Sequence, residues 1–264
     1  MKKKLQLAVN SAVVFAALLL VWQAAVWVLH IPPYMLPPPI NVGRAIATRF
    51  PELWASFWIS GEAAAAGLLG SIVGGLLIAL IFARLPWLRR MLFPYTILLQ
   101  TVPIVAIAPL ILMWAGQGLF AVALVTFIIC LAPIIANATQ GLISVDTNLL
   151  QLFLMHNASQ GQILRKLRLP HSLPYLFVGI RISSGIAVIG AITGELFAGS
   201  TRVGQGGLGY SILYAMAQLQ TDYLFALVFA ATILGFSFFF TVMFFEWLFL
   251  HKWHESARSE GSES

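Results

Sequence analysis

Long apolar runs are the feature that most constrains how this chain folds. Backbone N–H and C=O groups find no water in a bilayer, so a segment inside it must satisfy them itself, as a helix does. About 20 apolar residues are enough for one helical crossing. Six runs meet this length, near residues 5–29, 56–83, 91–114, 119–138, 176–198 and 223–250. We therefore predict an all-α fold, a polytopic transmembrane helical bundle with about six spans.

The composition excludes a soluble globular domain. Only 9% of the residues are charged and 60% are hydrophobic, whereas soluble domains carry about 25% charged residues. A net charge of +6 raises the possibility of nucleic-acid binding, but basic residues of membrane proteins gather in cytoplasmic loops and meet lipid there. We expect membrane lipid as a partner and no nucleic acid. Cys130 is the only cysteine and lies inside an apolar run. We therefore predict a small core residue there, and neither an internal disulfide nor a Cys-rich metal site.

The N-terminus has two possible interpretations. Lys2, Lys3 and Lys4 precede the first apolar run, as the basic residues of a signal peptide precede its apolar region. Signal-peptide apolar regions span only about 7–15 residues and end at a small-residue cleavage site. This run is longer, contains Trp22 and Trp27, and has no clear cleavage site, so we predict an uncleaved first span.

The distribution of basic residues predicts the orientation of the spans. With the N-terminus inside, only Arg44, Arg49 and Arg202 of the 15 basic residues fall outside. The others fall on the cytoplasmic side: Lys2, Lys3, Lys4, Arg84, Arg89, Arg90, Arg165, Lys166, Arg168, Arg181, Lys252 and Arg258. Both termini are therefore predicted to be cytoplasmic.

The connections between the runs predict one transmembrane domain over residues 1–264. Residues 5–55 hold the first span and a proline-rich external loop, and residues 56–250 form a five-helix core. Within that core, residues 139–175 form a long polar cytoplasmic loop. Residues 251–264 are a polar cytoplasmic tail.

The polar loop reads DTNLLQLFLMHNASQGQILRKLRLP from Asp146. Leu149, Leu150, Phe153 and Leu154 recur at helical spacing, and Asn157 tolerates the left-handed backbone of a sharp bend. A second amphipathic helix follows from Ala158 and Ser159. Because a residue before proline disfavours helical geometry, we expect this helix to end near Leu169. Two functions fit: an interfacial helix that contacts lipid phosphates, or a helix that docks into a groove on a cytoplasmic protein.

The loop resembles the cytoplasmic loop of ABC-importer permeases, whose signature is E-A-A, a glycine three residues later, and then Leu-Pro. Aligned on Leu169-Pro170, the signature glycine falls at Asn157 and the triplet falls at Gln151, Leu152 and Phe153. The string LLQTVPIVAIAPLILMWAGQG (98–118) is similar to the proline-rich third span of that family, with Ala115 where phenylalanine is usual. GAITGELFAGSTRVGQGGLGYSI (190–212) resembles a segment of the branch that includes nitrate, sulfonate, taurine, bicarbonate and thiamine-pyrimidine importers, and AMAQLQTDYLFA (215–226) is similar to the pyrimidine-precursor and riboflavin members.

The resemblance implies a type I importer permease of the bacterial inner membrane. It implies cytoplasmic ATPase subunits, a periplasmic or lipid-anchored substrate-binding protein and a second permease copy as partners. The implied ATPase-coupling residues are those of the loop: Gln151, Leu152, Phe153, Asn157, Ala158, Ser159, Gly161, Leu169 and Pro170. The sequence contains no G-x-x-x-x-G-K-[ST] loop, the motif that holds nucleotide phosphates. We therefore expect no cofactor on this chain, with ATP bound by a partner subunit.

Polar residues inside the spans are candidates for the translocation path, because ionisable groups are costly in lipid. The candidates are Glu62, Gln100, Thr101, Pro103 and Glu195. Pro103 also predicts a kink in the third span, because a proline frees a carbonyl of the helix. For the two glutamates the alternative is a helix-end carboxylate that bonds a neighbour or reaches water. A second functional hypothesis is an ion-coupled secondary carrier or channel that uses Glu62 and Glu195. No clustered set of histidines, cysteines and carboxylates has metal-site spacing, so neither a metal site nor an intramembrane enzyme is predicted.

Overall fold

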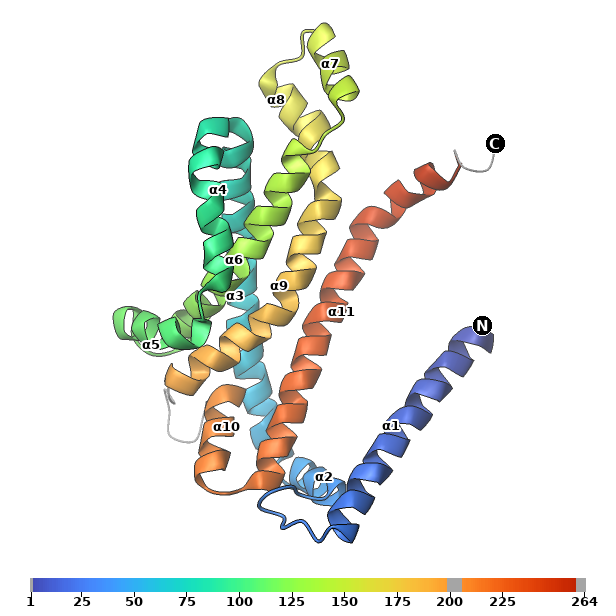
Figure 1. Ribbon diagram of the computed structural model, residues 1–264, viewed down its shortest axis with the longest axis vertical. Helices are drawn as coiled ribbons and strands as arrows, with labels where there is room; N and C mark the ends of the chain where they lie inside the picture. Colours follow the sequence, from blue (N-terminus) through green and yellow to red (C-terminus); the bar gives the residue numbers. More distant parts are fainter. Residues whose placement is uncertain (1, 199–205, 260–264) are drawn as a thin grey trace.

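The computed structural model describes residues 2–198 and 206–259, and every regular element in this part of the chain is a helix. Four long helices lie side by side in an elongated bundle (Figure 1): α3 (Phe50–Arg84), α6 (Leu119–Ile143), α9 (Leu169–Ala198) and α11 (Thr221–Ser259). At one end of the bundle lie α2 (Pro39–Thr48) and α10 (Leu208–Ala217). At the opposite end lie α7 (Thr147–Met155) and α8 (Gln160–Ile163). The all-α prediction is confirmed.

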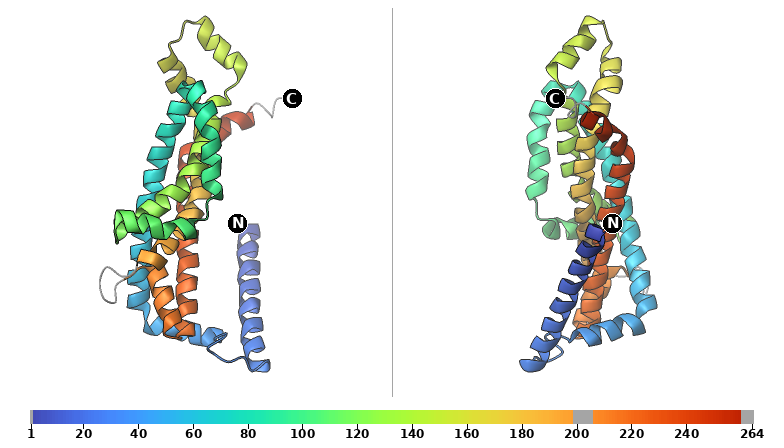
Figure 2. Two further views of the ribbon diagram at one scale, coloured as in Figure 1. Left: turned by 60° about the vertical axis from the view of Figure 1, so that its left-hand side comes forward. Right: turned by 90° about the vertical axis from the view of Figure 1, so that its right-hand side faces the viewer.

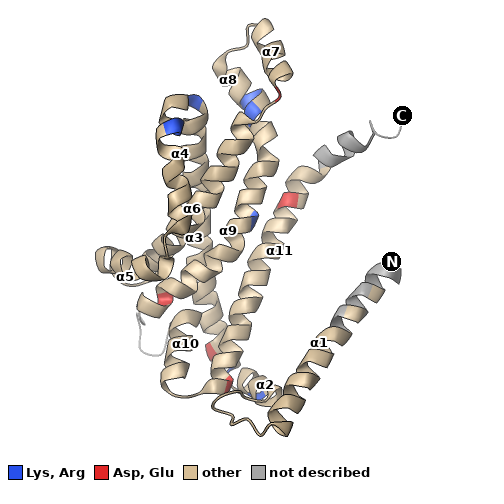
Figure 3. Ribbon diagram, in the orientation of Figure 1, with Lys and Arg blue, Asp and Glu red and all other residues tan. Residues whose placement is uncertain are grey.

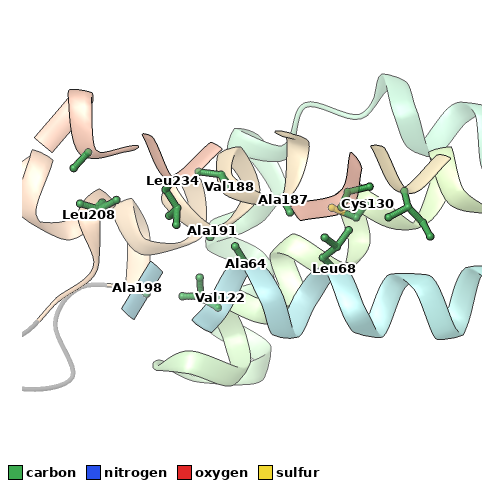
Figure 4. Close-up of a cluster of buried hydrophobic side chains, with 14 of the residues drawn as sticks. Ala64, Leu68, Val122, Cys130, Ala187, Val188, Ala191, Ala198, Leu208 and Leu234 are labelled. Carbon is green, nitrogen blue, oxygen red and sulfur yellow. The ribbon is translucent and has the colours of Figure 1, made fainter. Parts of the chain in front are cut away.

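Small residues bring α3, α6 and α9 into close contact. A Cβ atom added at Gly67 of α3 would lie 2.4 Å from Cβ of Thr126 on α6. The two helices are therefore so close at this point that only glycine fits. Ala64, Ala187 and Ala191 are fully buried in the same core, together with Cys130 (Figure 4). Because lipid supplies no hydrophobic drive between helices, such close packing is what holds a bundle together in a membrane. Cys130 is thus a small core residue, as predicted.

Four helices are long and apolar enough to cross a membrane: Phe50–Arg84, Leu119–Ile143, Gln160–Ala198 and Thr221–His251. A fifth crossing arises if the bent pair α4 (Pro86–Thr101) and α5 (Ile104–Ala115) counts as one span. This pair occupies the predicted third span, 91–114, but its two helices meet at 103°. Val102 has an extended backbone (φ −72°, ψ 122°), because the ring of Pro103 disfavours helical geometry at the residue before it. The proline therefore breaks this span completely.

Helix α1 (Lys2–Val28) corresponds to the predicted first span. It stands apart from the bundle along most of its length, which the left view of Figure 2 shows clearly. Near its C-terminal end Trp22 packs on α11, with ring centroids 5.7 Å from Phe225 and 6.3 Å from Phe229. Its described apolar part, Val13–Val28, is shorter than the four long spans, so the total of six spans stays a prediction.

The positions of the charged residues along the bundle are shown in Figure 3. The basic residues at the start of α4 and beside α8 lie at one end, and the single basic residue of α2, Arg44, lies at the other. These positions agree with the predicted distribution, but Arg181 departs from it, because it lies within the span Gln160–Ala198. Arg202 lies outside the described residues. We refer to the α7–α8 end as the inner end and to the α2–α10 end as the outer end. The cytoplasmic location of both termini stays a prediction.

The expectation that the second loop helix ends near Leu169 is wrong. Helix α8 passes into a π-helical turn, η1 (Leu164–Arg168), and continues as α9, so that Gln160–Ala198 is one helix of 39 residues. The N–H of Leu169 donates to the carbonyl of Leu164, five residues back. A π turn inserts one extra residue into the helical hydrogen-bond ladder, and here it lies directly before Pro170, whose missing N–H would otherwise interrupt an α-helix.

Candidate functional site

The inner end is formed by a two-helix hairpin, α7–α8, that projects beyond the bundle (Figure 1). Asp146 caps α7, since its Oδ1 accepts from the N–H of Asn148 at 2.7 Å. None of the nine residues of α7 is buried. Leu152 is 49% exposed and Met155 is 80% exposed. Helix α7 thus presents apolar side chains that nothing in the described chain covers.

Asn157 makes the turn between the two hairpin helices. Its φ of 54° lies in the left-handed region, which confirms the predicted bend. The N–H of Asn157 donates to Leu154 O and the N–H of Ala158 donates to Phe153 O, both at 3.0 Å. These two bonds form a Schellman motif, which satisfies the last carbonyls of a helix.

Ser159 starts the second helix of the hairpin, as predicted. Its Oγ accepts from the N–H of Gln162 at 3.3 Å, while Oε1 of Gln162 accepts from the N–H of Ser159 at 2.8 Å. This reciprocal pair is a capping box. Gly161 lies beside it and is exposed, with no atom nearer than 4.0 Å to the position of an added Cβ. The turn is therefore held by local bonds.

Two side chains anchor the hairpin to the bundle. Ile163 is 1% exposed and packs into the interior, and Nη1 of Arg168 donates to Ala83 O at the end of α3, at 3.2 Å. Leu169 and Pro170 lie half-buried at the base of the hairpin. Of the predicted coupling residues, Gln151, Leu152, Asn157 and Ser159 are exposed, and Phe153 and Ala158 are half-buried.

The outer end contains a closed hydrogen-bond network around Glu195, which is 5% exposed. Oγ of Ser60 on α3 lies 2.8 and 2.7 Å from the two carboxylate oxygens and donates to them. The N–H of Gly209 on α10 donates to Oε2 of Glu195 at 2.8 Å, and the N–H of Leu208 donates to Ser60 Oγ at 2.7 Å. A buried carboxylate is stable only with such partners. Glu195 therefore joins α3, α9 and α10 at one point.

Close packing at two glycines keeps α10 against this carboxylate. A Cβ added at Gly207 would lie 2.0 Å from Oε1 of Glu195. One added at Gly209 would lie 2.3 Å from the carbonyl of Ile192 on α9. Real Cβ atoms essentially never come so near. A side chain at position 209 would therefore push α10 away from the backbone of α9, and one at position 207 would displace the Glu195 carboxylate.

The other predicted path residues are exposed. Glu62 lies on an outward face of α3, and the structure shows no hydrogen bond or ion pair between it and Glu195 among the described residues. Gln100, Thr101 and Pro103 lie at the α4–α5 break, all exposed, where Thr101 Oγ1 donates to Leu98 O at 2.8 Å. Of the five candidates, four are thus exposed on the surface of this chain and only Glu195 is buried.

The sequence did not predict Ser60 as a site residue, nor a hollow of about 450 Å³ that charged, hydroxyl and apolar side chains line near the start of α3. Arg49 lines the hollow, with its guanidinium carbon 4.5 Å from the centre of the Tyr223 ring and an ion pair to Glu52 at 3.7 Å. Ser56 bonds Ser211 of α10 below it, at 2.9 Å. The available signal was the four-residue spacing of Glu52, Ser56 and Ser60, which places all three on one face of α3.

An ion pair between Arg181 and Glu246 joins α9 to α11 within the bundle. No group of three or more His, Cys, Asp or Glu side chains that could hold a metal ion occurs in residues 2–198 and 206–259.

The chain is similar to a family of transport proteins and to several of its members. The family model described as "binding-protein-dependent transport system inner membrane component" matches residues 71–252. A probable ABC transporter permease protein of Haemophilus influenzae is 30% identical over 239 residues, which are 90% of this chain and 94% of the relative. The formylaminopyrimidine transport permease protein ThiX of Halalkalibacterium halodurans is 30% identical over 240 residues, 89% of this chain and 92% of the relative.

Two further similarities come from a relative and a solved structure. The riboflavin transport system permease protein RibX of Chloroflexus aurantiacus is 33% identical over 205 residues, 76% of this chain and 75% of the relative. The MetNI methionine ABC transporter, solved in inward-facing conformations, shares the fold with a TM-score of 0.54 at 22% identity. That match covers 73% of this chain and 97% of the MetNI chain.

Proposed function

This chain belongs to the binding-protein-dependent transport system inner membrane component family, and from that premise we propose that it forms the path by which a small nutrient enters the cell. It is a multi-pass protein of the bacterial inner membrane and an ABC transporter permease. In this proposal ATP is bound and hydrolysed by separate cytoplasmic subunits, and an external binding protein, periplasmic or lipid-anchored, delivers the nutrient. A second copy of the chain completes the membrane part.

The hairpin α7–α8 carries the proposal. A helix with exposed Leu152 and Met155 is unfavourable in water and fits a groove on another protein. The capping box at Ser159 and the Schellman motif at Asn157 hold the hairpin in shape before any partner binds, which lowers the entropy cost of docking. The predicted coupling residues Gln151, Leu152, Phe153, Asn157, Ala158, Ser159, Gly161, Leu169 and Pro170 all belong to this hairpin or its base.

The path is proposed to run past the α4–α5 break and Glu62. A charge turned toward lipid costs roughly 2.5–3.5 kcal/mol near the bilayer centre, so an exposed Glu62 in the long apolar helix α3 is better placed against water or a second copy. Gln100 and Thr101 are exposed at the break, where a helix interrupted by Pro103 supplies free backbone groups to a water-filled path.

The nutrient is proposed to belong to the classes transported by the relatives. Their names specify formylaminopyrimidine, riboflavin, aliphatic sulfonates and taurine. All are small polar compounds.

The test is coupled transport by the reconstituted complex. Ala158→Arg places a bulky charge in the hairpin turn and is expected to abolish substrate uptake driven by ATP while the chain still inserts into the membrane. Tyr34→Arg, at an exposed position of the outer loop, is the control and should leave uptake unchanged. Uptake by the lone chain driven by an ion gradient would contradict the proposal and favour the carrier that uses Glu62 and Glu195.

A further inference from the structure

One uninterrupted helix connects the two ends of the molecule. Gln160–Ala198 has 39 residues and, at about 1.5 Å per residue, is about 58 Å long. Its inner end is the second half of the hairpin, and Glu195 lies one turn from its outer end. Both regions described above therefore belong to the same continuous helix.

Helix α10 is attached to that element by the Glu195 network. Two N–H groups of its first turn are engaged, Leu208 by Ser60 Oγ and Gly209 by Glu195. At its other end Leu219 adopts a left-handed backbone (φ 54°), and the N–H of Gln220 donates to Ala215 O at 2.9 Å. This tight turn leads directly into α11, so α10 is held at both ends.

We propose that Glu195 and Ser60 are positioning residues that make α10 move as one unit with the outer end of α9. The inference rests on the proposed function, because it assumes that an ATPase displaces the hairpin. A displacement delivered at the hairpin then travels along one helix, reaches α10 through the carboxylate, and passes through the Leu219 turn to α11. The outer end of the bundle therefore moves when the ATPase displaces the hairpin, although the ATPase does not contact the outer end.

The contacts favour this role over that of a simple helix cap. A cap requires one acceptor from the neighbouring turn, whereas Ser60 and Glu195 come from two other helices and bond each other as well as α10. The glycines at 207 and 209 bring α10 into van der Waals contact with the carboxylate and with the backbone of α9. Such a joint leaves no room for α10 to slide.

Spin labels measure the proposed movement directly. Ile189 of α9 and Leu213 of α10 are both exposed, so cysteines can replace them, and the native Cys130 is buried. The labelled chain, diluted with unlabelled chain, is assembled with its ATPase subunits and binding protein in nanodiscs. Electron–electron double resonance then gives the 189–213 distance without nucleotide and in the ATP-trapped state.

The expected result is the same distance distribution in both states, because α9 and α10 move together. Ser60→Ala removes the hydroxyl that joins α3 to the carboxylate and should broaden or shift the distribution in one state. It should also lower the substrate transported per ATP hydrolysed about fivefold or more, the range of a typical coupling energy, while ATP hydrolysis continues.

Ser71→Ala is the matched control. Ser71 lies on the same helix and is equally buried, but its Oγ bonds the backbone of Gly67 and Phe127, not α10. It should behave as the unchanged protein does. Gly209→Ala tests the joint without altering a polar group and should reproduce the effect of Ser60→Ala.

Two results would overturn the inference: a 189–213 distance that differs between the two states of the unchanged protein, or a Ser60→Ala variant with unchanged transport per ATP. Failure of the proposed function appears differently, as a chain that captures no ATPase subunits.

Discussion

The inner and outer ends of this molecule are built by opposite means. The hairpin is shaped by bonds between residues at most five apart, such as Ser159 with Gln162, and its apolar side chains remain exposed. The outer end is shaped by bonds between distant residues, since Glu195 and Ser60 are 135 positions apart, and its polar groups are buried. The difference fits the proposed docking of a partner at the inner end and a closed joint at the outer end.

If the outer network is a closed joint, removing its centre should have the largest effect on stability. Glu195→Ala leaves the buried Ser60 hydroxyl and the Gly209 N–H without an acceptor, at roughly 1–3 kcal/mol for each unsatisfied group. Thermal unfolding in detergent measures the loss. Glu62→Ala removes an exposed carboxylate and should change the free energy of unfolding by less than about 0.5 kcal/mol. Equal losses in the two variants would contradict the structural role of the Glu195 network.

The hairpin turn should respond to backbone geometry alone. Asn157→Val places a β-branched residue at φ 54°, a conformation that costs L-residues roughly 1–2 kcal/mol. ATP-driven uptake should fall, because the docking surface is misaligned, whereas overall thermal stability should fall by no more than this conformational cost. Asn157→Gly, which removes the Cβ, should retain uptake, and loss of uptake in that variant too would show that the asparagine side chain itself is required.

The smallest effect is expected at the start of α8. Ser159→Ala removes one half of the capping box, at a cost of about 1 kcal/mol. Hydrogen exchange should become faster for the amides of the first turn of α8 and stay unchanged in α10. Faster exchange at both ends would mean that the caps of the hairpin are coupled to the outer joint even without a partner.

The same contrast explains what could be predicted from the sequence. The bend at Asn157, the start of the second helix at Ser159 and the burial of Cys130 depend on local geometry or local composition, and each is confirmed. Ser60 as the partner of Glu195 was not predicted, because no local pattern relates residues on two different helices.

Of the two expectations that rested on prolines, the bend at Pro103 is confirmed and the helix end before Pro170 is wrong. At Pro103 the chain bends by 103°, more than the predicted kink, because Val102 leaves the helical region. At Pro170, which follows the π turn Leu164–Arg168, the helix continues where an end was expected. A lone proline in a sequence does not show which of the two will happen.

The most direct test of the account is whether this chain binds separate ATPase subunits through the hairpin and hydrolyses no ATP without them. The chain is purified from its own membranes under mild conditions, once unchanged and once with Leu152→Asp, and the captured proteins and their ATPase activity are measured. The account predicts that the unchanged chain retains ATPase subunits, that Leu152→Asp loses them, and that the stripped chain hydrolyses no ATP. Retention of the ATPase by Leu152→Asp, or ATP hydrolysis by the stripped chain, would contradict it.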